Sequence, residues 1–403
     1  MFTRSNLLLL ILILIASSYS IAGPEDWRVA LCISENPAQQ MNVSWRTVTE
    51  LNTPLVQLAL NSPQAKFNKD PRVIHAATNQ VLRSDSSTVY AYSAKMKDLV
   101  AGTSYAYRMG SKDVWSEWFT FKTAEATQEN FKFIYFGDPQ NGLKSHVSRA
   151  FRAGYAAAPD AAFFTMAGDL VSTGNRDDQW ADLFYAGSWI LGQVPLVPVM
   201  GNHAYYYDNQ WNKIHTTQWR PHFTLPENGL ASLPETNYYF HYQGVLFIVL
   251  NGSEQQAEQA EWLDELLTRE SDTWIILSMH QPLYSSKEGR DGEKLRAHFL
   301  PVIDKRKVDL VLQGHDHTFG RTFPLVKDRK ASRWEKGTVY INSVAGSKQY
   351  GPGPNRADLF AVTGSDTQYY HIVEVSSKKL RLLSYSVDGT MVDEVTINAV
   401  RRN

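Results

Sequence analysis

The chain of 403 residues is 43% hydrophobic and 20% charged, which is an ordinary globular composition and enough length for two domains. A formal net charge of −1 excludes the basic surplus that binding to nucleic acid requires, so we expect no nucleic-acid partner. Cys32 has no second cysteine to pair with, which excludes an intramolecular disulfide and thiolate metal clusters. Any metal must therefore bind through nitrogen and oxygen ligands.

The first 22 residues have the pattern of a secretory signal. Arg4 precedes an apolar run from Leu7 to Ala16, and small residues would allow cleavage after Ala22. The run is shorter than the ~20 apolar residues that span a bilayer, and no later stretch supplies them. We therefore expect a secreted or periplasmic protein with no stable membrane insertion.

Residues 23–125 have the pattern of short strands separated by turns, which favours an all-β sandwich. The segment Leu99-Val-Ala-Gly-Thr-Ser-Tyr105 resembles the corner of fibronectin type III domains, in which a tyrosine hydroxyl holds the chain, although Ala101 replaces the usual proline. No catalytic cluster is found here, so we expect a packing or spacing module. The expected strands are Arg28–Ser34, Met41–Thr47, Val56–Leu60, Ser87–Lys95, Ser104–Gly110 and Trp118–Lys122.

Strands and helices alternate in residues 126–403, after a polar boundary. This order is typical of βαβ units with parallel strands. The first expected elements are strand Phe131–Phe136, helix Leu143–Ala157, strand Ala161–Met166, helix Arg176–Leu191 and strand Val194–Met200. Each of the three strands ends in glycine followed by an acid or an amide.

An irregular, aromatic-rich segment from Ala204 to Asn237 comes next, and regular structure then returns. The expected elements are the hairpin Tyr238–Tyr242 and Val245–Leu250, helix Glu254–Thr268, strand Trp274–Met279, helix Glu293–Lys305 and a strand from Val308. Four further strands, expected to be antiparallel and to complete a second sheet, are Thr338–Asn342, Tyr369–Val375, Lys379–Val387 and Met391–Ile397.

Potential metal ligands follow these strands, at the end where open α/β sheets deliver functional groups. His315 and His317 lie two residues apart, so in an extended backbone both would point into one cavity, whereas two solvated histidines in a surface turn are the alternative. The full candidate set is Asp138, Asp169, Asn202, His280, His315 and His317. These donors suit Zn, Mn or Fe, and their number indicates two ions bridged by one carboxylate, for which Asp169 is best placed.

Five ordered motifs resemble the series of the calcineurin-like metallophosphoesterases. They are Gly137-Asp138, Gly168-Asp169, Gly201-Asn202-His203, Met279-His280 and Gly314-His315-Asp316-His317. The preceding sandwich and the segment His280-Gln-Pro-Leu-Tyr-Ser285 make the chain similar to the purple acid phosphatase branch. This resemblance implies an α/β fold with a four-layer α/β/β/α catalytic domain behind the sandwich.

The resemblance also implies roles for individual residues. Attack by a metal-bound hydroxide on a phosphate ester is expected, with His203 contacting the phosphoryl group or protonating the leaving oxygen. The alternative for His203 is a packed histidine that supports Asn202, and Tyr284 is a further candidate substrate contact. By the resemblance, Asp138, Asp169 and His317 hold the first ion, and Asp169, Asn202, His280 and His315 the second.

Three positions depart from the family pattern. Ser172 replaces a tyrosinate ligand, which predicts no charge-transfer colour and less preference for ferric iron. Gln140 stands where many relatives have a histidine, so the first ion would be held more weakly or would be Mn or Mg, with Gln140 as an uncertain ligand. Ala204 replaces an acid, which predicts a less firmly oriented His203.

The expected function is hydrolysis of small-molecule phosphate monoesters, as in an acid phosphatase. A phosphodiesterase that uses the same centre is the first alternative. The second is a binding or adhesion protein whose altered first site has lost its metal.

Overall fold

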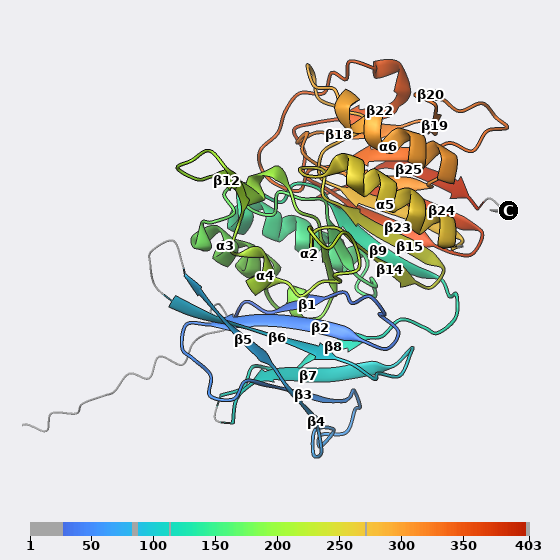
Figure 1. Cartoon of the computed structure of the whole chain (residues 1–403). Coiled ribbons are helices and arrows are strands. Elements are labelled where there is room, and N and C mark those ends of the chain that lie inside the picture. Colours follow the sequence, from blue (N-terminus) through green and yellow to red (C-terminus); the bar gives the residue numbers. More distant parts are fainter. Residues whose placement is uncertain (1–26, 83–87, 113, 271, 400–403) are drawn as a thin grey trace, which may run out of the picture.

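The computed structural model describes residues 27–82, 88–112, 114–270 and 272–399 (Figure 1). The expected signal sequence at residues 1–22 lies outside these ranges. No helix within them combines the length and the apolar character needed to cross a membrane.

The amino-terminal part is an all-β sandwich, as the strand pattern predicts. Trp45 and Tyr107 are fully buried between its two layers. One layer contains β1 (Ala30–Cys32), β2 (Met41–Thr47), β6 (Thr88–Met96) and β5 (Ala77–Leu82), in that order. The other contains β4 (Arg72–His75), β3 (Leu55–Leu60), β7 (Ser104–Gly110) and β8 (Phe119–Lys122).

The expected tyrosine corner is present between β6 and β7. The Tyr105 hydroxyl accepts a hydrogen bond of 2.9 Å from the backbone N–H of Val100. This bond fixes the chain where it enters β7, although Ala101 stands at the usual proline position.

The first sheet of the α/β region has a parallel centre and an antiparallel edge. Its order is β25-β24-β23-β9-β10-β11. The parallel strands are β9 (Phe131–Phe136), β10 (Phe164–Met166) and β11 (Leu196–Pro198), and the antiparallel strands are β23 (Tyr369–Val375), β24 (Lys379–Ser386) and β25 (Met391–Asn398). Its helices are α2 (Ser148–Ala157), which continues a π-helical turn η1 (Leu143–Val147), and α3 (Asp177–Gly187), which leads into the 3-10 helix η2 (Ser188–Gly192).

The second sheet of the α/β region has the order β14-β15-β16-β17-β21-β18-β22. Its strands are β14 (Tyr238–Tyr242), β15 (Val245–Leu250), β16 (Trp274–Met279), β17 (Leu310–Gln313), β21 (Val339–Asn342), β18 (Phe319–Thr322) and β22 (Phe360–Gly364). Helices α5 (Gln256–Arg269) and α6 (Glu293–Arg306) cover its outer face (Figure 1).

Alternate side chains of β15 show how the layers form. Phe247 packs against Phe133 of the first sheet, with ring centroids 5.8 Å apart. Its neighbour Ile248 instead belongs to the core that contains Leu263 of α5 and Phe299 of α6. Because successive side chains of a strand point to opposite faces, β15 separates two cores, and the predicted four-layer arrangement is confirmed.

The expectation that the last four strands together complete a second sheet is wrong. The strand β21 pairs in parallel with β17 in the second sheet. The strands β23, β24 and β25 extend the first sheet, with β23 antiparallel to β9. Strand propensity identified all four segments, but a local pattern does not contain the long-range pairing that assigns each one to a sheet.

One layer of the sandwich is continuous with the first sheet of the α/β region. Cys32 of β1 pairs in parallel with Leu196 of β11, so the β1 layer and that sheet form one ten-stranded sheet. Burial raises the pKa of the Cys32 thiol to about 12, as expected for a packing residue. Nothing in the pattern of either segment predicts this pairing.

The segment from residue 204 to 237 contains short elements where an irregular loop was expected. They are β12 (Tyr205–Tyr207) and β13 (Lys213–His215), which form a hairpin, and α4 (Trp219–His222). The remaining short elements are η3 (Asn202–Ala204), η4 (Ala357–Leu359), β19 (Leu325–Val326) and β20 (Arg329–Lys330).

Candidate metal centre

Glycine directly precedes four of the six candidate ligands, at positions where a side chain would occupy the space of a ligand. A Cβ at Gly168, which has a φ of +85°, would lie 2.4 Å from Nδ1 of His280. A Cβ at Gly201 would lie 2.1 Å from Oδ1 of Asp169. The repeated glycine at the strand ends therefore allows ligands from different strands to approach each other closely.

Four predicted ligands converge around Nε2 of His280, and we call them the second-ion group. This nitrogen lies 3.0 Å from Oδ2 of Asp169, 3.0 Å from Oδ1 of Asn202 and 3.1 Å from Nδ1 of His315. They follow the ends of β10, β11, β16 and β17, so the predicted convergence at the carboxyl ends of parallel strands is observed.

The remaining predicted ligands lie beside Asp169, and we call them the first-ion group. They are Asp138, His317 and the uncertain ligand Gln140. Nε2 of Gln140 lies 3.1 Å from Oδ2 of Asp169 and 3.0 Å from Nε2 of His317. Nε2 of His317 lies 3.7 Å from Oδ1 of Asp138. Asp169 therefore contacts both groups, which is the position that a bridging carboxylate needs.

His315 and His317 both reach the centre, but not through the extended backbone that was expected. Their φ angles are +71° and +51°, and Asp138 and Asp169 also have positive φ, at +34° and +46°. Such angles cost non-glycine residues free energy and are typical of functional sites. The backbone N–H of His315 donates to Oδ2 of Asp138, which holds the turn against β9.

Backbone carbonyls orient two of the imidazoles. Nδ1 of His280 donates to the carbonyl of Ala167 at 2.9 Å, and Nδ1 of His317 donates to the carbonyl of Lys348 at 3.0 Å. These bonds place the proton on Nδ1 and leave the lone pair of Nε2 facing the centre, which is the arrangement of metal-binding histidines.

Burial and neighbouring charges shift the pKa values of these ligands. Burial raises the pKa of Asp138 well above its usual value. Burial also acts to raise the pKa of Asp169, but the charge of His280 and hydrogen bonds lower it to about 2. Burial lowers the pKa of His315 to about 2, so this imidazole is neutral and can act as a ligand.

His203 lies at the edge of the centre. Its Nε2 is 3.8 Å from Oδ2 of Asp169, and its backbone N–H donates to Oδ1 of the same carboxylate at 2.9 Å. Its Nδ1 donates to the carbonyl of Ser172 at 2.6 Å. Ala204 offers no carboxylate to this ring, and the backbone carbonyl of Ser172 supplies an orienting acceptor instead; the expectation of a less firmly oriented His203 stays a prediction.

The donor set fits a pair of metal ions. Oδ1 of Asp138 and Oε1 of Gln140 are buried and have no hydrogen-bond partner. A buried oxygen without a partner is costly unless something binds it. Nitrogen and oxygen donors on both sides of Asp169 suit Zn, Mn or Fe, so these residues fit the two ions that the sequence predicts.

Asp316 is a positioning residue that the sequence analysis passed over. Its buried carboxylate accepts hydrogen bonds from Ser285 Oγ at 2.9 Å, Ser286 N at 2.8 Å and Arg290 Nη1 at 3.1 Å. These bonds fix the turn that carries His315 and His317. The sequence contained a signal for this role, because Asp316 stands between two predicted ligands, where an acidic side chain has little room to reach solvent.

Tyr284 lies apart from the candidate ligands. It is 2% exposed and belongs to the core beneath α5 and α6. Its ring packs on Tyr340 and beneath the guanidinium of Arg296. The structure therefore does not bring this side chain to the centre, although it follows His280 closely in the sequence.

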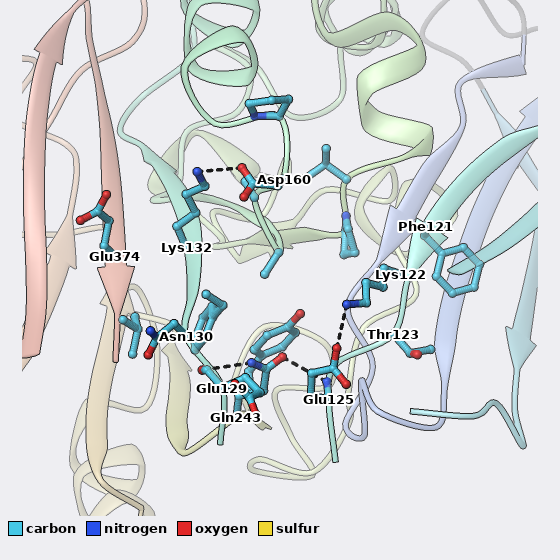
Figure 2. A pocket seen from close by; sticks show the side chains of 18 of the residues that line it. Phe121, Lys122, Thr123, Glu125, Glu129, Asn130, Lys132, Asp160, Gln243 and Glu374 are labelled. Carbon is cyan, nitrogen blue, oxygen red and sulfur yellow. Dashed lines mark hydrogen bonds and ion pairs between the residues drawn. The ribbon is translucent and has the colours of Figure 1, made fainter. Parts of the chain in front are cut away.

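A cavity of about 1250 Å³ lies between the sandwich and the sheets of the α/β region (Figure 2). Lys132, near the start of β9, pairs with Asp160 at 2.8 Å, and Lys122 pairs with Glu125 at 2.7 Å. The candidate ligands follow the opposite ends of β9 and β10, and none of them lines this cavity. It is therefore separate from the metal centre.

Two family models match the chain. The model for the purple acid phosphatase N-terminal domain matches residues 27–123, and the model for calcineurin-like phosphoesterases matches residues 131–319. The first covers the sandwich, and the second covers all six strand-end ligands and His203.

Relatives and a solved structure agree with these models. An uncharacterized protein of Mycobacterium tuberculosis is 26% identical over 73% of this chain, and the match spans 62% of that protein's length. Probable purple acid phosphatase 20 of Arabidopsis thaliana is 24% identical, with 75% of this chain and 70% of that protein covered. The structure of purple acid phosphatase PPD1 from yellow lupin covers 92% of this chain and 74% of its own, with a TM-score of 0.76 and 19% identity.

Proposed function

We propose that this chain, which belongs to the calcineurin-like phosphoesterases in a purple acid phosphatase-like branch, is an exported dimetal enzyme that hydrolyses phosphate monoesters. The observation that carries the proposal is the convergence of Asp169, His280 and His315, whose ligand atoms all lie within 4.8 Å of one another. Asp138, Gln140 and His317 provide a second set of donors beside the same Asp169.

The centre combines the chemistry of bound ions with roles for its own side chains. When bound, a pair of ions supplies Lewis acidity toward phosphoryl oxygens and acidifies water. Asp169 and Asp138 place negative charge where those ions would be held. His203 presents Nε2 toward the centre, where the protonated ring can donate to the leaving oxygen of a phosphate ester.

The orientation of His203 supports this role. The Ser172 carbonyl fixes one ring nitrogen and the Asp169 carboxylate accepts from the His203 backbone, so the ring keeps one direction. Its side chain is 35% exposed, whereas that of His280 is fully buried. His203 can therefore reach both a substrate and solvent, from which it regains its proton.

A metal-depletion experiment tests the proposal. Purified protein should contain two ions per chain and hydrolyse p-nitrophenyl phosphate. Chelation should remove both properties, and reloading with Mn, Zn or Fe should restore them. The variant His203→Ala should keep the ions and lose turnover, whereas His298→Ala, an exposed histidine of α6, should keep both. Parallel assays on bis(p-nitrophenyl) phosphate measure the preference for monoesters over diesters.

One observation favours a second candidate, a binding protein with an incomplete metal centre. The Gln140 amide donates to both Asp169 and His317 and so occupies lone pairs that a first ion would use. This candidate predicts fewer than two ions per chain after reloading, and no hydrolysis of either ester.

A further inference from the structure

One backbone segment, residues 343–348, directly follows β21 and lies along the turn that carries the first candidate ligand. The N–H of Ala345 donates to the carbonyl of Gly137 at 2.6 Å, and the N–H of Gly346 donates to the carbonyl of Asp138 at 3.0 Å. The position of Asp138 therefore depends on where this segment lies.

The same segment reaches the other two members of the first-ion group. The carbonyl of Lys348 accepts the Nδ1 proton of His317 at 3.0 Å. A Cβ at Gly346 would lie 2.0 Å from the carbonyl oxygen of Gln140, so the two backbones are in close contact. Within the described ranges, no hydrogen bond joins the segment to a member of the second-ion group. The segment is therefore tied to one ion group and not to the other.

A buried imidazole holds the start of this segment. His371 of β23 is fully buried, and its Nε2 lies 2.6 Å from Oγ of Ser343. Its Nδ1 lies 2.9 Å from Oγ of Ser384 on β24. The rings of Tyr135 and Phe319 stack on the imidazole, with centroids 5.0 and 5.8 Å from it. His371 therefore joins the segment to the antiparallel edge of the first sheet.

The hydrogen bonds are what a histidine adds at this position. Burial lowers the pKa of His371 to about 3, so the ring is neutral, with one nitrogen that donates and one that accepts. Both nitrogens have a serine partner, and a fully satisfied buried network makes the surrounding core more rigid. A phenyl ring would stack between the same aromatic neighbours without making either bond.

We propose that His371 is a positioning residue for the first ion, because its hydrogen bond to Ser343 fixes the segment that in turn fixes Asp138 and His317. This inference rests on the proposed function, since it assigns an ion to the first-ion group. The second ion has ligands that the segment does not contact, so its binding should not depend on His371.

A competition titration of Zn²⁺ against a chelator tests the inference. His371→Phe keeps a ring between Tyr135 and Phe319 and removes both hydrogen bonds. The first ion should bind about tenfold more weakly in this variant, as is typical when a group that supports a metal ligand is lost, while the Kd of the second ion stays unchanged. Asp138→Ala identifies the Kd of the first ion, because this variant lacks a ligand of that group alone.

Two further variants separate positioning from general damage to the core. His222→Phe is the matched control, since His222 is also buried and stacks on Trp180 and Phe184, and it should change neither Kd. Ser343→Ala removes the same hydrogen bond from its other end, so the double variant with His371→Phe should bind the first ion no more weakly than either single variant. Equal weakening of both ions, an equal loss in His222→Phe, or additive losses in the double variant would overturn the inference.

Hydrogen exchange of the metal-free protein gives a readout that needs no ion. Peptides that contain residues 343–348 should exchange about 2- to 10-fold faster in His371→Phe than in the wild type or His222→Phe, a factor that corresponds to the net free energy of one hydrogen bond. Unchanged exchange in this segment would overturn the inference. If His371→Phe does not fold, Ser343→Ala takes its place in both measurements. Loaded wild type that holds fewer than two ions would contradict the proposed function, while the exchange rates would still decide whether His371 holds the segment.

Discussion

Replacing Asp177 with Asn should destabilise the protein through its domain junction. Asp177 begins α3 of the α/β region, and its carboxylate binds two arginines of the sandwich. Arg28 donates to Oδ1 at 2.8 Å and to Oδ2 at 3.1 Å, and Arg46 donates to the same two oxygens, with 3.0 Å to Oδ2. The exposed fractions of the three side chains are 4% for Asp177, 7% for Arg28 and 3% for Arg46.

The size of the expected destabilisation follows from the burial of these charges. Removing one member of a buried ion pair costs about 3–5 kcal/mol, because the remaining charge is left without compensation. Asparagine keeps one oxygen acceptor but loses the negative charge, and two guanidinium groups depend on that charge. We therefore expect a loss of about 3–5 kcal/mol in the free energy of unfolding.

The same carboxylate makes stability depend on pH. Burial acts to raise the pKa of Asp177, but hydrogen bonds and charges from Arg46 and Arg28 hold it well below its usual value. The folded protein therefore favours the ionised form. The contribution of the ionised Asp177 to the free energy of unfolding is complete above the pKa of the unfolded state, about 3.9, and is lost as the pH falls below that value.

Urea unfolding followed by tryptophan fluorescence measures both effects. Asp177→Asn should lower the urea midpoint at neutral pH. When the pH is lowered, the midpoint of this variant should fall less than the midpoint of the wild type. The control is Asp178→Asn, because this neighbouring side chain is 58% exposed and pairs with Arg176 on the surface. A midpoint of Asp177→Asn equal to that of the control would refute the reasoning.

Three further predictions concern the metal centre. Asp169→Ala removes the carboxylate shared by both groups, so metal content and turnover should both be lost; retention of either would count against the assignment. Gln140→His replaces an amide with an imidazole and should tighten binding of the first ion about tenfold in a competition titration with a chelator, and unchanged affinity would contradict a role for this position. Gly168→Ala places a methyl group 2.4 Å from the His280 ring, so the second ion should be lost in elemental analysis while circular dichroism stays unchanged.

The carboxyl ends of the strands were predictable because several independent signals coincide there. The bounds of β9, β14, β15 and β16 agree with the sequence expectation at both ends. The apolar runs of β15 and β16 are buried throughout, β14 is buried on one face, and each strand ends where a turn residue or ligand begins. The fold class followed from the alternation of strands and helices along the sequence. Most of the candidate ligands were found among the residues that follow each strand.

The pairing between distant segments was not predictable, because strand propensity is local. Cys32 looked like an ordinary buried residue of a short strand, and its register with Leu196 joins two domains into one sheet. The polar boundary expected between residues 125 and 126 is a change in composition, whereas the physical junction also includes β1, β11 and the ion pair at Asp177.

The metal centre shows the same limit at the scale of single residues. The sequence predicted that His315 and His317 reach one site, but the extended backbone assumed for them is replaced by two left-handed residues. That conformation is maintained by the Asp138 carboxylate, which binds the His315 N–H, and by Asp316, which holds the same turn from the other side. Contacts made by neighbouring strands therefore offset local strain. A spacing rule can identify ligands, whereas the direction in which each ligand points depends on side chains that are far away in the sequence.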